Sequence, residues 1–368
     1  MRLPIFTAEQ SSSIRLCGYH LNIGSSNLQY FAYSGNRPAC AIPTDKIIEV
    51  TSCDDGKPRP SSSDTLRPTE GGIHPREAAD HHVDLSTQLF SKLLSDNNIS
   101  TREIGAVAFS QGPGMGACLR TGAAAARTIS EHLGVPLIGV NHCVAHIEIG
   151  REQCGCDDPI LLYVSGGNTQ VIARLDGRYR VLGETLDIGI GNMLDKFARK
   201  HGIPFPGGPV IEQKSLEWIS KNPNPSLVGL ELPYAVHGMD LAFSGLMSAA
   251  NKLVSEGVPF EAVCWSIQEH AFAACIEVAE RALAHTGKSE ILLGGGVACN
   301  QRLREMSSIM CSERDASSHC PPKMYCIDNG TMIARLGWLE IRSGRTTSLT
   351  HSGIDQEMRT DQTPISWP

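Results

Sequence analysis

The sequence has no uninterrupted apolar run near the roughly 18 residues that a membrane-spanning helix requires. Residues 1–18 lack both a continuous apolar centre and a small-residue cleavage site, so they do not form a signal peptide. Basic residues are also few, since 32 Lys and Arg stand against 39 Asp and Glu, a net charge of −7. This balance argues against a broad basic surface for nucleic acid, although a local patch or a basic partner remains compatible with it. We therefore expect a cytoplasmic protein without a membrane segment.

The 13 cysteines include no C-x-x-C pair, which argues against zinc-ribbon and thioredoxin-like sites. Only Cys154 and Cys156 lie close together, and the odd total fits reduced thiols better than a disulfide framework. A Walker A loop and a G-x-G-x-x-G fingerprint are also absent from the sequence.

Apolar runs, glycine turns and helical periodicity alternate along most of the 368 residues, which indicates an α/β protein of two to three domains. Residues 54–72 read as a loop or linker. Strands are expected at Lys46–Cys53, Ile104–Ser110, Leu137–Val140, Ile291–Leu293 and Tyr325–Ile327, and on both sides of the turn Ser165–Asn168. Helices are expected from Pro75 to about Leu94, from the Gly116 turn to about His132, at His142–Glu152, at Glu261–His285 with Gly287 as its cap, from about Asn300, and from Gly330 to about Ser343.

Two histidines, His142 and His146, stand four residues apart in a predicted helix. Positions i and i+4 share a helix face, so both imidazoles can bind one metal ion if other segments add ligands. Two partly buried histidines with ordinary hydrogen bonds are the alternative. The metalloprotease motif needs Glu directly after the first His, and Cys143 stands there instead.

Several glycine turns follow predicted strands, where backbone amides can approach phosphate oxygens without interference from a side chain. A nucleotide site and ordinary chain turns are both compatible with this pattern. The turns are Gly112–Gly116, Ser165–Asn168, Gly207–Pro209, Gly294–Gly296 and Asp328–Gly330.

Acidic residues lie in or beside these turns, where they either cap helices, face solvent or bind ligands. They are Asp187, Asp195, Glu212, Asp240 and Asp328. Of these, Asp328 follows a predicted strand and precedes a glycine, and it is the candidate for binding a metal or a ribose.

Seven stretches in order resemble the universal tRNA threonylcarbamoyltransferase family, and more closely its archaeal and eukaryotic branch, the catalytic subunit of the KEOPS complex. They are NHCVAHIEIGR, YVSGGNTQV, GETLDIGIGNMLDK, FPGGP, MDLAFSGL, GGGVACN and CIDNGTMIA. The resemblance covers about residues 71–368.

The resemblance implies an actin-like, sugar-kinase-like fold of two ribonuclease-H-like lobes around a nucleotide cleft. On this basis residues 71–153 form the first lobe, with the helix 331–343 packing back on it, and residues 154–330 form the second. Residues 344–368 form a C-terminal tail, and residues 1–70 are a divergent segment of uncertain fold.

The resemblance also implies the site residues. The metal ligands would be His142, His146, Tyr163 and Asp328, and the ion would be iron or, alternatively, zinc. Threonylcarbamoyl-adenylate would be bound by Tyr163, Val164, Ser165, Gly166, Gly167, Asp195, Gly208, Glu212 and Asn300.

The implied reaction moves the threonylcarbamoyl group to the exocyclic amine of the adenosine 3′ of the anticodon, in tRNAs that read A-starting codons. The adenylate is already activated, so positioning and charge stabilisation suffice, and we assign no general base. Family members act with a kinase-like ATPase, a dimerisation subunit and a regulatory subunit. Some archaeal chains fuse the ATPase at the C-terminus, but this chain stops at Pro368, so we expect no fusion.

The first 70 residues depart from the family pattern, because its opening strand–turn–strand hairpin with an acidic turn is not recognisable. The nearest fragments are Cys17–Tyr19 and Ile23–Ser26. A mistaken translation, a diverged hairpin and a non-catalytic paralogue are the three explanations. Besides the transferase, the alternatives are therefore a scaffold of the complex, an ATPase or sugar kinase of the same superfamily, and a metalloprotease.

Overall fold

The computed structural model describes the backbone of residues 15–21, 26–34, 39–41, 50–52, 61–66, 74–96, 98 and 100–367, with side chains only from residue 74 onward. The chain divides into two compact units. Unit 1 comprises residues 1–67, 73–153 and 328–368, and unit 2 comprises residues 68–72 and 154–327. The long stretch of unit 2 is therefore inserted into the sequence of unit 1.

Unit 1 contains a five-stranded sheet in the order β5-β2-β1-β6-β7. The pairs β2–β5 and β1–β2 are antiparallel, whereas β1–β6 and β6–β7 are parallel. The strands are β1 (Arg15–Leu21), β2 (Ser26–Ser34), β5 (Ser61–Leu66), β6 (Ile104–Gly112) and β7 (Leu137–Asn141), and a small separate pair joins β3 (Ala39–Ala41) to β4 (Val50–Ser52).

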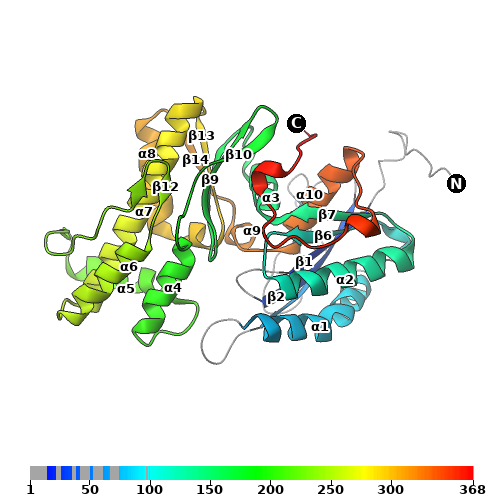
Figure 1. Ribbon diagram of the computed structural model, residues 1–368, viewed down its shortest axis with the longest axis horizontal. Helices are drawn as coiled ribbons and strands as arrows, with labels where there is room; N and C mark the ends of the chain where they lie inside the picture. Colours follow the sequence, from blue (N-terminus) through cyan, green and yellow to red (C-terminus); the bar gives the residue numbers. More distant parts are fainter. Residues whose placement is uncertain are drawn as a thin grey trace. The chain divides into compact units, whose positions relative to one another are not determined.

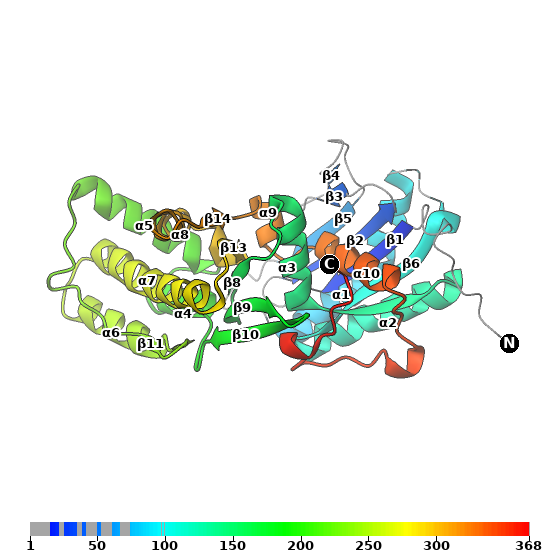
Figure 2. The same ribbon diagram turned by 90° about the horizontal axis from the view of Figure 1, so that it is seen from above.

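Helices cover both faces of this sheet: α1 and α2 lie side by side on one face, and α10 lies on the other (Figures 1 and 2). The four residues 106–109 of β6 are all buried, as expected for a central strand covered on both sides. The helices are α1 (Pro75–Asp96), α2 (Gly116–Leu133), α3 (His142–Cys154) and α10 (Gly330–Arg342), with short 3₁₀ turns at Thr101–Glu103, Leu349–His351 and Thr360–Gln362.

The N-terminal region corrects one expectation. The family hairpin was not recognisable in the sequence, but β1 and β2 form an antiparallel pair that joins the sheet through β6. Residues 17–19 lie inside β1, and the turn between the strands, residues 22–25, lies outside the described residues. Of the expected strand Lys46–Cys53, residues 50–52 form β4, and the remainder lies outside the described residues.

Unit 2 contains a second five-stranded sheet in the order β10-β9-β8-β13-β14. The pairs β8–β9 and β9–β10 are antiparallel, and β8, β13 and β14 run parallel. The strands are β8 (Ile160–Val164), β9 (Thr169–Leu175), β10 (Arg178–Glu184), β13 (Glu290–Gly294) and β14 (Ser317–His319), with a separate pair β11 (Val236–His237) and β12 (Asp240–Leu241).

The helical layer of unit 2 centres on α7, which contacts α5, α6 and α8 (Figure 2). This 27-residue helix ends as expected at Gly287, whose φ of 68° gives the left-handed C-cap that glycine adopts without steric cost. The helices are α4 (Ile190–Lys200), α5 (Gly207–Lys221), α6 (Ser244–Ser255), α7 (Phe260–Thr286), α8 (Gln301–Glu313) and α9 (Lys323–Cys326), with a 3₁₀ turn at Gly296–Cys299.

The expected strand Tyr325–Ile327 is wrong. The structure places Tyr325 and Cys326 in the short helix α9, and the edge strand of the sheet is β14. Pro321 and Pro322 stand directly before α9, where the fixed φ of proline suits a first helical turn. The apolar run of three residues was too short to distinguish a strand from a helix.

Candidate functional site

Two imidazoles and one carboxylate meet in unit 1. His142 is the first residue of α3 and His146 lies one turn later, so both side chains leave the same face of the helix. The Nε2 atom of His146 lies 2.8 Å from Oδ1 of Asp328, and Nε2 of His142 lies 3.4 Å from the same oxygen. The ligand atoms of all three residues lie within 4.8 Å of one another. Three of the four predicted metal ligands are therefore together.

Asparagine caps set the positions of these side chains. Oδ1 of Asn141 accepts hydrogen bonds from two backbone amides in the first turn of α3, at 2.9 and 3.1 Å. Asn329 caps α10 in the same way and directly follows Asp328. Because such caps satisfy amides that the helix itself leaves unpaired, the start of each helix is well defined. His142 and Asp328 stand at these helix starts, so the caps also fix the positions of these two ligands.

The protonation states of Asp328 and His146 suit metal binding. Burial alone would raise the pKa of Asp328, but attraction to His142 and hydrogen bonds from both imidazoles hold that pKa well below its usual range. Burial lowers the pKa of His146 and outweighs its hydrogen bond to Asp328. An ionised carboxylate beside a neutral imidazole is the state that coordinates a divalent cation.

The donor set matches a divalent transition metal. Two imidazole nitrogens and one carboxylate oxygen suit zinc or iron, and the two-His, one-carboxylate set with open positions is typical of non-haem iron. The fourth predicted ligand, Tyr163, belongs to unit 2, where it lies buried near the end of β8. Its role as a ligand stays a prediction.

The C-terminal tail is fastened to the helix that carries the two histidines. Nε1 of Trp367 donates a hydrogen bond of 2.7 Å to Oε1 of Glu148, which follows His146 by two residues on α3. Both side chains are buried. Earlier in the tail, Arg127 of α2 binds the hydroxyl and the carbonyl of Ser352. The tail is therefore part of the packing around α3.

In unit 2, the predicted phosphate turn joins β8 to β9 and lies against the start of α4. The backbone amide of Gly191 donates to the carbonyl of Ser165 at 3.1 Å, and that of Asn192 donates to the carbonyl of Gly166 at 2.9 Å. A Cβ on Gly191 would lie 2.8 Å from the Cα of Gly166 and from the oxygen of Ser165. The close approach of turn and helix therefore requires glycine at this position.

Hydrogen bonds from backbone amides to carboxylates connect the segments that carry most of the other predicted substrate residues. Oδ1 of Asp195 accepts from the amides of Gly207 and Gly208, at 2.7 and 3.3 Å, at the start of α5. Oε1 of Glu212 accepts from the amide of Gln301, at 2.7 Å, beside Asn300. These contacts run from α4 through α5 to the start of α8. They bring the predicted residues into one region of unit 2.

Four of the five acidic residues singled out in the sequence, all except Asp328, thus accept hydrogen bonds from backbone amides. Asp187 receives the amides of Phe243 and Ser244 at the start of α6, and Asp240 receives that of Glu184. Burial raises the pKa of Asp195 despite its two backbone donors. Burial also opposes the charge of Asp187, but the backbone amides around it give that residue a lowered pKa.

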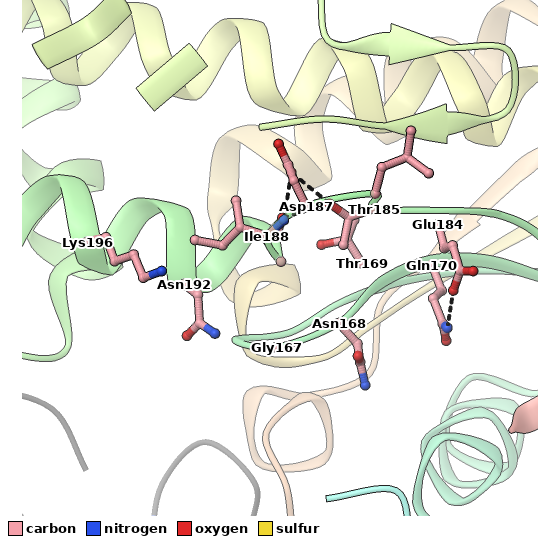
Figure 3. A pocket seen from close by; sticks show the side chains of 12 residues that line it. Gly167, Asn168, Thr169, Gln170, Glu184, Thr185, Asp187, Ile188, Asn192 and Lys196 are labelled. Atoms are coloured by element: carbon pink, nitrogen blue, oxygen red, sulfur yellow. Dashed lines mark hydrogen bonds between the residues drawn. The ribbon is translucent and has the colours of Figure 1, made fainter. Parts of the chain in front are cut away.

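A cavity of about 350 Å³ lies beside the phosphate turn. It is lined by residues 167–170, by residues 184–189, and by Asn192 and Lys196 of α4 (Figure 3). Of the predicted substrate residues only Gly167 lines it, so the sequence prediction missed most of this surface. The signal was available, because Asn192 and Lys196 stand four residues apart in the quoted stretch GETLDIGIGNMLDK and so share one helix face.

A protein-family comparison decides what these motifs represent. The model of the tRNA N6-adenosine threonylcarbamoyltransferase family matches residues 60–335. The chain belongs to this family. The resemblance predicted from the seven motifs is confirmed, and the matched range includes all the predicted ligands and substrate residues.

Curated relatives of this threonylcarbamoyltransferase family are archaeal proteins of two lengths. The tRNA N6-adenosine threonylcarbamoyltransferase of Methanococcoides burtonii is 51% identical over 336 residues, which is 90% of this chain and 94% of the relative. The probable bifunctional tRNA threonylcarbamoyladenosine biosynthesis protein of Methanosarcina mazei is 53% identical over 332 residues, 89% of this chain and 57% of the relative. The chain thus spans little more than half the length of the bifunctional relatives.

Solved structures support the fold at low sequence identity. A crystal structure of HypF from T. kodakarensis matches 90% of this chain and 49% of its own, with a TM-score of 0.56 and 13% identity. Full-length HypF in a phosphate- and nucleotide-bound form matches 88% of this chain and 56% of its own, with a TM-score of 0.52 and 10% identity. The predicted actin-like, sugar-kinase-like fold class is confirmed. Within the described residues no helix is long and apolar enough to cross a membrane.

Proposed function

We propose that this chain transfers the threonylcarbamoyl group of threonylcarbamoyl-adenylate to the exocyclic amine of the adenosine 3′ of the anticodon, in tRNAs that read A-starting codons. The observation that carries the proposal is the convergence of His142, His146 and Asp328 in a chain of the threonylcarbamoyltransferase family. A metal-dependent acyl transfer requires such a set of metal-binding side chains, whereas a purely structural domain does not.

The metal proposed for this site is iron. Zinc is the alternative, because the same imidazole and carboxylate donors also bind zinc. When bound, a divalent ion supplies positive charge that polarises a carbonyl oxygen. Tyr163 completes the proposed ligand set from unit 2. The protein's own part is to hold the two imidazoles and the carboxylate in place through the caps of α3 and α10.

The phosphate of the acyl-adenylate is proposed to bind at the turn Ser165–Asn168. The positive end of the α4 dipole lies beside this turn, and Lys196 adds a full positive charge to the wall of the adjoining cavity. Gly166 and Gly167 present backbone amides without side chains that would keep an anion away. Asp195, Gly208, Glu212 and Asn300 are proposed to bind the rest of the adenylate.

The reaction needs no enzyme nucleophile. The amine nitrogen of the adenosine attacks the carbamoyl carbonyl carbon, the bond from that carbon to the phosphate oxygen breaks, and the adenylate leaves with the electron pair. Because the leaving group is already activated, the residues contribute orientation and stabilisation of charge on the phosphate. No residue is assigned as the base that receives the amine proton.

Partners are proposed to complete the tRNA-binding surface, since the chain itself carries a net charge of −7. The proposed assembly is a KEOPS-type complex in the cytoplasm, with a kinase-like ATPase, a dimerisation subunit and a regulatory subunit. The scaffold alternative rests on an N-terminal nucleotide hairpin that the sequence does not show. β1 and β2 pair, but the turn between them lies outside the described residues, so a scaffold stays the alternative proposal.

Reconstitution tests the proposal. The chain, the partner subunits, unmodified tRNA and threonylcarbamoyl-adenylate are mixed, and threonylcarbamoyladenosine is measured by mass spectrometry. We expect product from the wild-type chain, none from His146→Ala, and wild-type amounts from the matched control His132→Ala, an exposed histidine of α2. If the Methanococcoides burtonii relative forms product under the same conditions and this chain does not, the proposal is wrong for this chain.

A further inference from the structure

A second group of side chains that could hold a metal ion lies in unit 2, and none of them belongs to the site proposed for the transferase. The ligand atoms of Cys156, Glu290 and His319 lie within 4.8 Å of one another. Cys156 is buried, whereas the side chains of Glu290 and His319 are 24% and 28% exposed. A thiol, a carboxylate and an imidazole are the three protein groups that zinc binds most often, and this set remains open to solvent on one side.

The cluster is built by three separate segments. Cys156 lies between α3 and β8, Glu290 is the first residue of β13, and His319 is the last residue of β14. In the parallel register Glu290 stands opposite Ser317 and Leu292 stands opposite His319. Because side chains alternate between faces with a period of two, Glu290 and His319 project from the same face of the sheet.

Hydrogen bonds already orient the carboxylate toward the cluster. Oε2 of Glu290 accepts the backbone amides of Asp157 and Asp158, at 3.1 and 3.0 Å. Its other oxygen, Oε1, lies 4.0 Å from Nε2 of His319. The two amides belong to the same loop as Cys156, so the loop and the carboxylate are held together. Outer partners of this kind orient the ligands of known metal sites.

A second thiol adjoins the first. Cys154 lies two residues before Cys156, and the two thiols are joined by a side-chain hydrogen bond. The ten cysteines from Cys118 onward in the described chain form no disulfide, so both sulfurs remain available as thiols. With Cys154 the cluster offers four donors, which is the usual number in a structural zinc site.

We infer that Cys156, Glu290 and His319 form a binding site for a zinc-class divalent ion, with Cys154 as the fourth ligand. Zinc bonds of about 2.0–2.3 Å place tetrahedral ligand atoms about 3.5 Å apart, so a contraction of about 1 Å closes the cluster around an ion. The bound ion ties the loop between α3 and β8 to the edge pair β13–β14. Its role is structural, and it is distinct from the ion proposed in unit 1.

Cobalt titration distinguishes this site from the first. The full chain is reduced, stripped of metal with a chelator and titrated with Co²⁺ while thiolate-to-cobalt charge-transfer absorption is recorded. The cluster of His142, His146 and Asp328 contains no thiol, so this absorption reports only sulfur ligation. We expect a band in the wild-type chain, and in His146→Ala, where the first site is disabled, we expect the band to saturate at one equivalent of Co²⁺.

Substitutions assign the band to individual residues. Cys156→Ser removes it, and the partly exposed His319→Gln, which should fold normally, weakens Co²⁺ binding by about 100-fold. Cys299→Ser is the control, because Cys299, Cys320 and Cys326 form the other group of neighbouring thiols in unit 2. The absence of a band in the wild-type chain, its survival in Cys156→Ser, unchanged binding by His319→Gln or loss of the band in Cys299→Ser would each overturn the inference.

Discussion

Substitutions at three glycines of unit 2 test separately how the phosphate turn packs and whether it contacts the substrate. Gly191 contacts the turn through its backbone, and an added Cβ there would lie 2.8 Å from Gly166 and Ser165. A Cβ on Gly167 or on Gly245 would have no heavy atom within 4 Å. Replacing each by alanine therefore adds the same methyl group to three different surroundings.

The expected cost of Gly191→Ala comes from the contact distance. Carbon atoms pack at about 3.5–4.0 Å, so the turn or α4 must move by about 1 Å. Such overpacking costs about 1–3 kcal/mol, and the gain from alanine over glycine in a helix offsets about 0.5–1 kcal/mol. With the middle value of each range the net loss is about 1 kcal/mol, which lowers the Tm of a unit of this size by about 2–4 °C.

The two open positions predict different results. Gly167→Ala should change stability by no more than about 0.5 kcal/mol, as should Gly245→Ala at the start of α6. The methyl group on residue 167, however, lies where the phosphate is proposed to bind and should raise the KM for threonylcarbamoyl-adenylate about tenfold or more. Gly191→Ala should raise that KM as well, because it displaces the same turn.

Scanning calorimetry and steady-state kinetics with the reconstituted complex measure both quantities on each variant. A wild-type Tm for Gly191→Ala would refute the steric reasoning. A wild-type KM for Gly167→Ala, with Gly245→Ala also unchanged, would show that the turn does not hold the phosphate. The two results are independent, so either part can fail alone.

Three further predictions concern unit 1. Burial, aided by the neighbouring His81, lowers the pKa of His82 from 6.5 to about 3. Between these two pKa values the unfolded chain binds a proton that the folded chain does not bind. The folded state therefore loses stability as the pH falls from about 6.5 toward 3. Between pH 7 and pH 5 the loss is about 2 kcal/mol. Urea titrations at the two pH values should show this loss, and His82→Leu should lack it. Trp367→Phe removes the donor to Glu148 and should cost about 1–3 kcal/mol by urea titration, whereas an unchanged midpoint would mean that the tail does not stabilise α3. Asp328→Asn should weaken metal binding in unit 1 by about 100-fold and reduce product in parallel, so full activity without metal would contradict the ligand assignment.

The sequence predicted helices and strands well where glycines or turn residues mark their ends. The helix α7 was predicted from its apolar pattern and Gly287, and the β8–β9 hairpin from the turn Ser165–Asn168. The β1–β2 pair was missed because its place in the sheet depends on pairing with β6, more than 80 residues later, which no local pattern reports. Tyr325–Ile327 was assigned wrongly because three apolar residues fit a strand and a short helix equally well.

The functional residues likewise divide into those that a local sequence pattern indicates and those that depend on contacts between distant segments. The pair His142 and His146 is visible from helical spacing alone. Asp328, 182 residues after His146, was a candidate from its position beside a glycine turn, but only the motifs joined it to the two histidines. The cluster around Cys156 joins residues that lie 134 and 163 positions apart from it, so spacing carries no signal for it. Lys196 was visible in a quoted motif, yet only the cavity showed which face of α4 it occupies.

The inserted arrangement of the two units has a consequence for the growing polypeptide on the ribosome. Domains generally fold as units in the order of their synthesis. Residues 154–327 emerge as one stretch and can close their sheet at once, whereas unit 1, although it begins first, waits for α10 and the tail. The histidines of α3 therefore receive Asp328 only after unit 2 has been made. During this interval β1, β2 and β6 lack the cover of α10, and we expect chaperones to bind the nascent chain there.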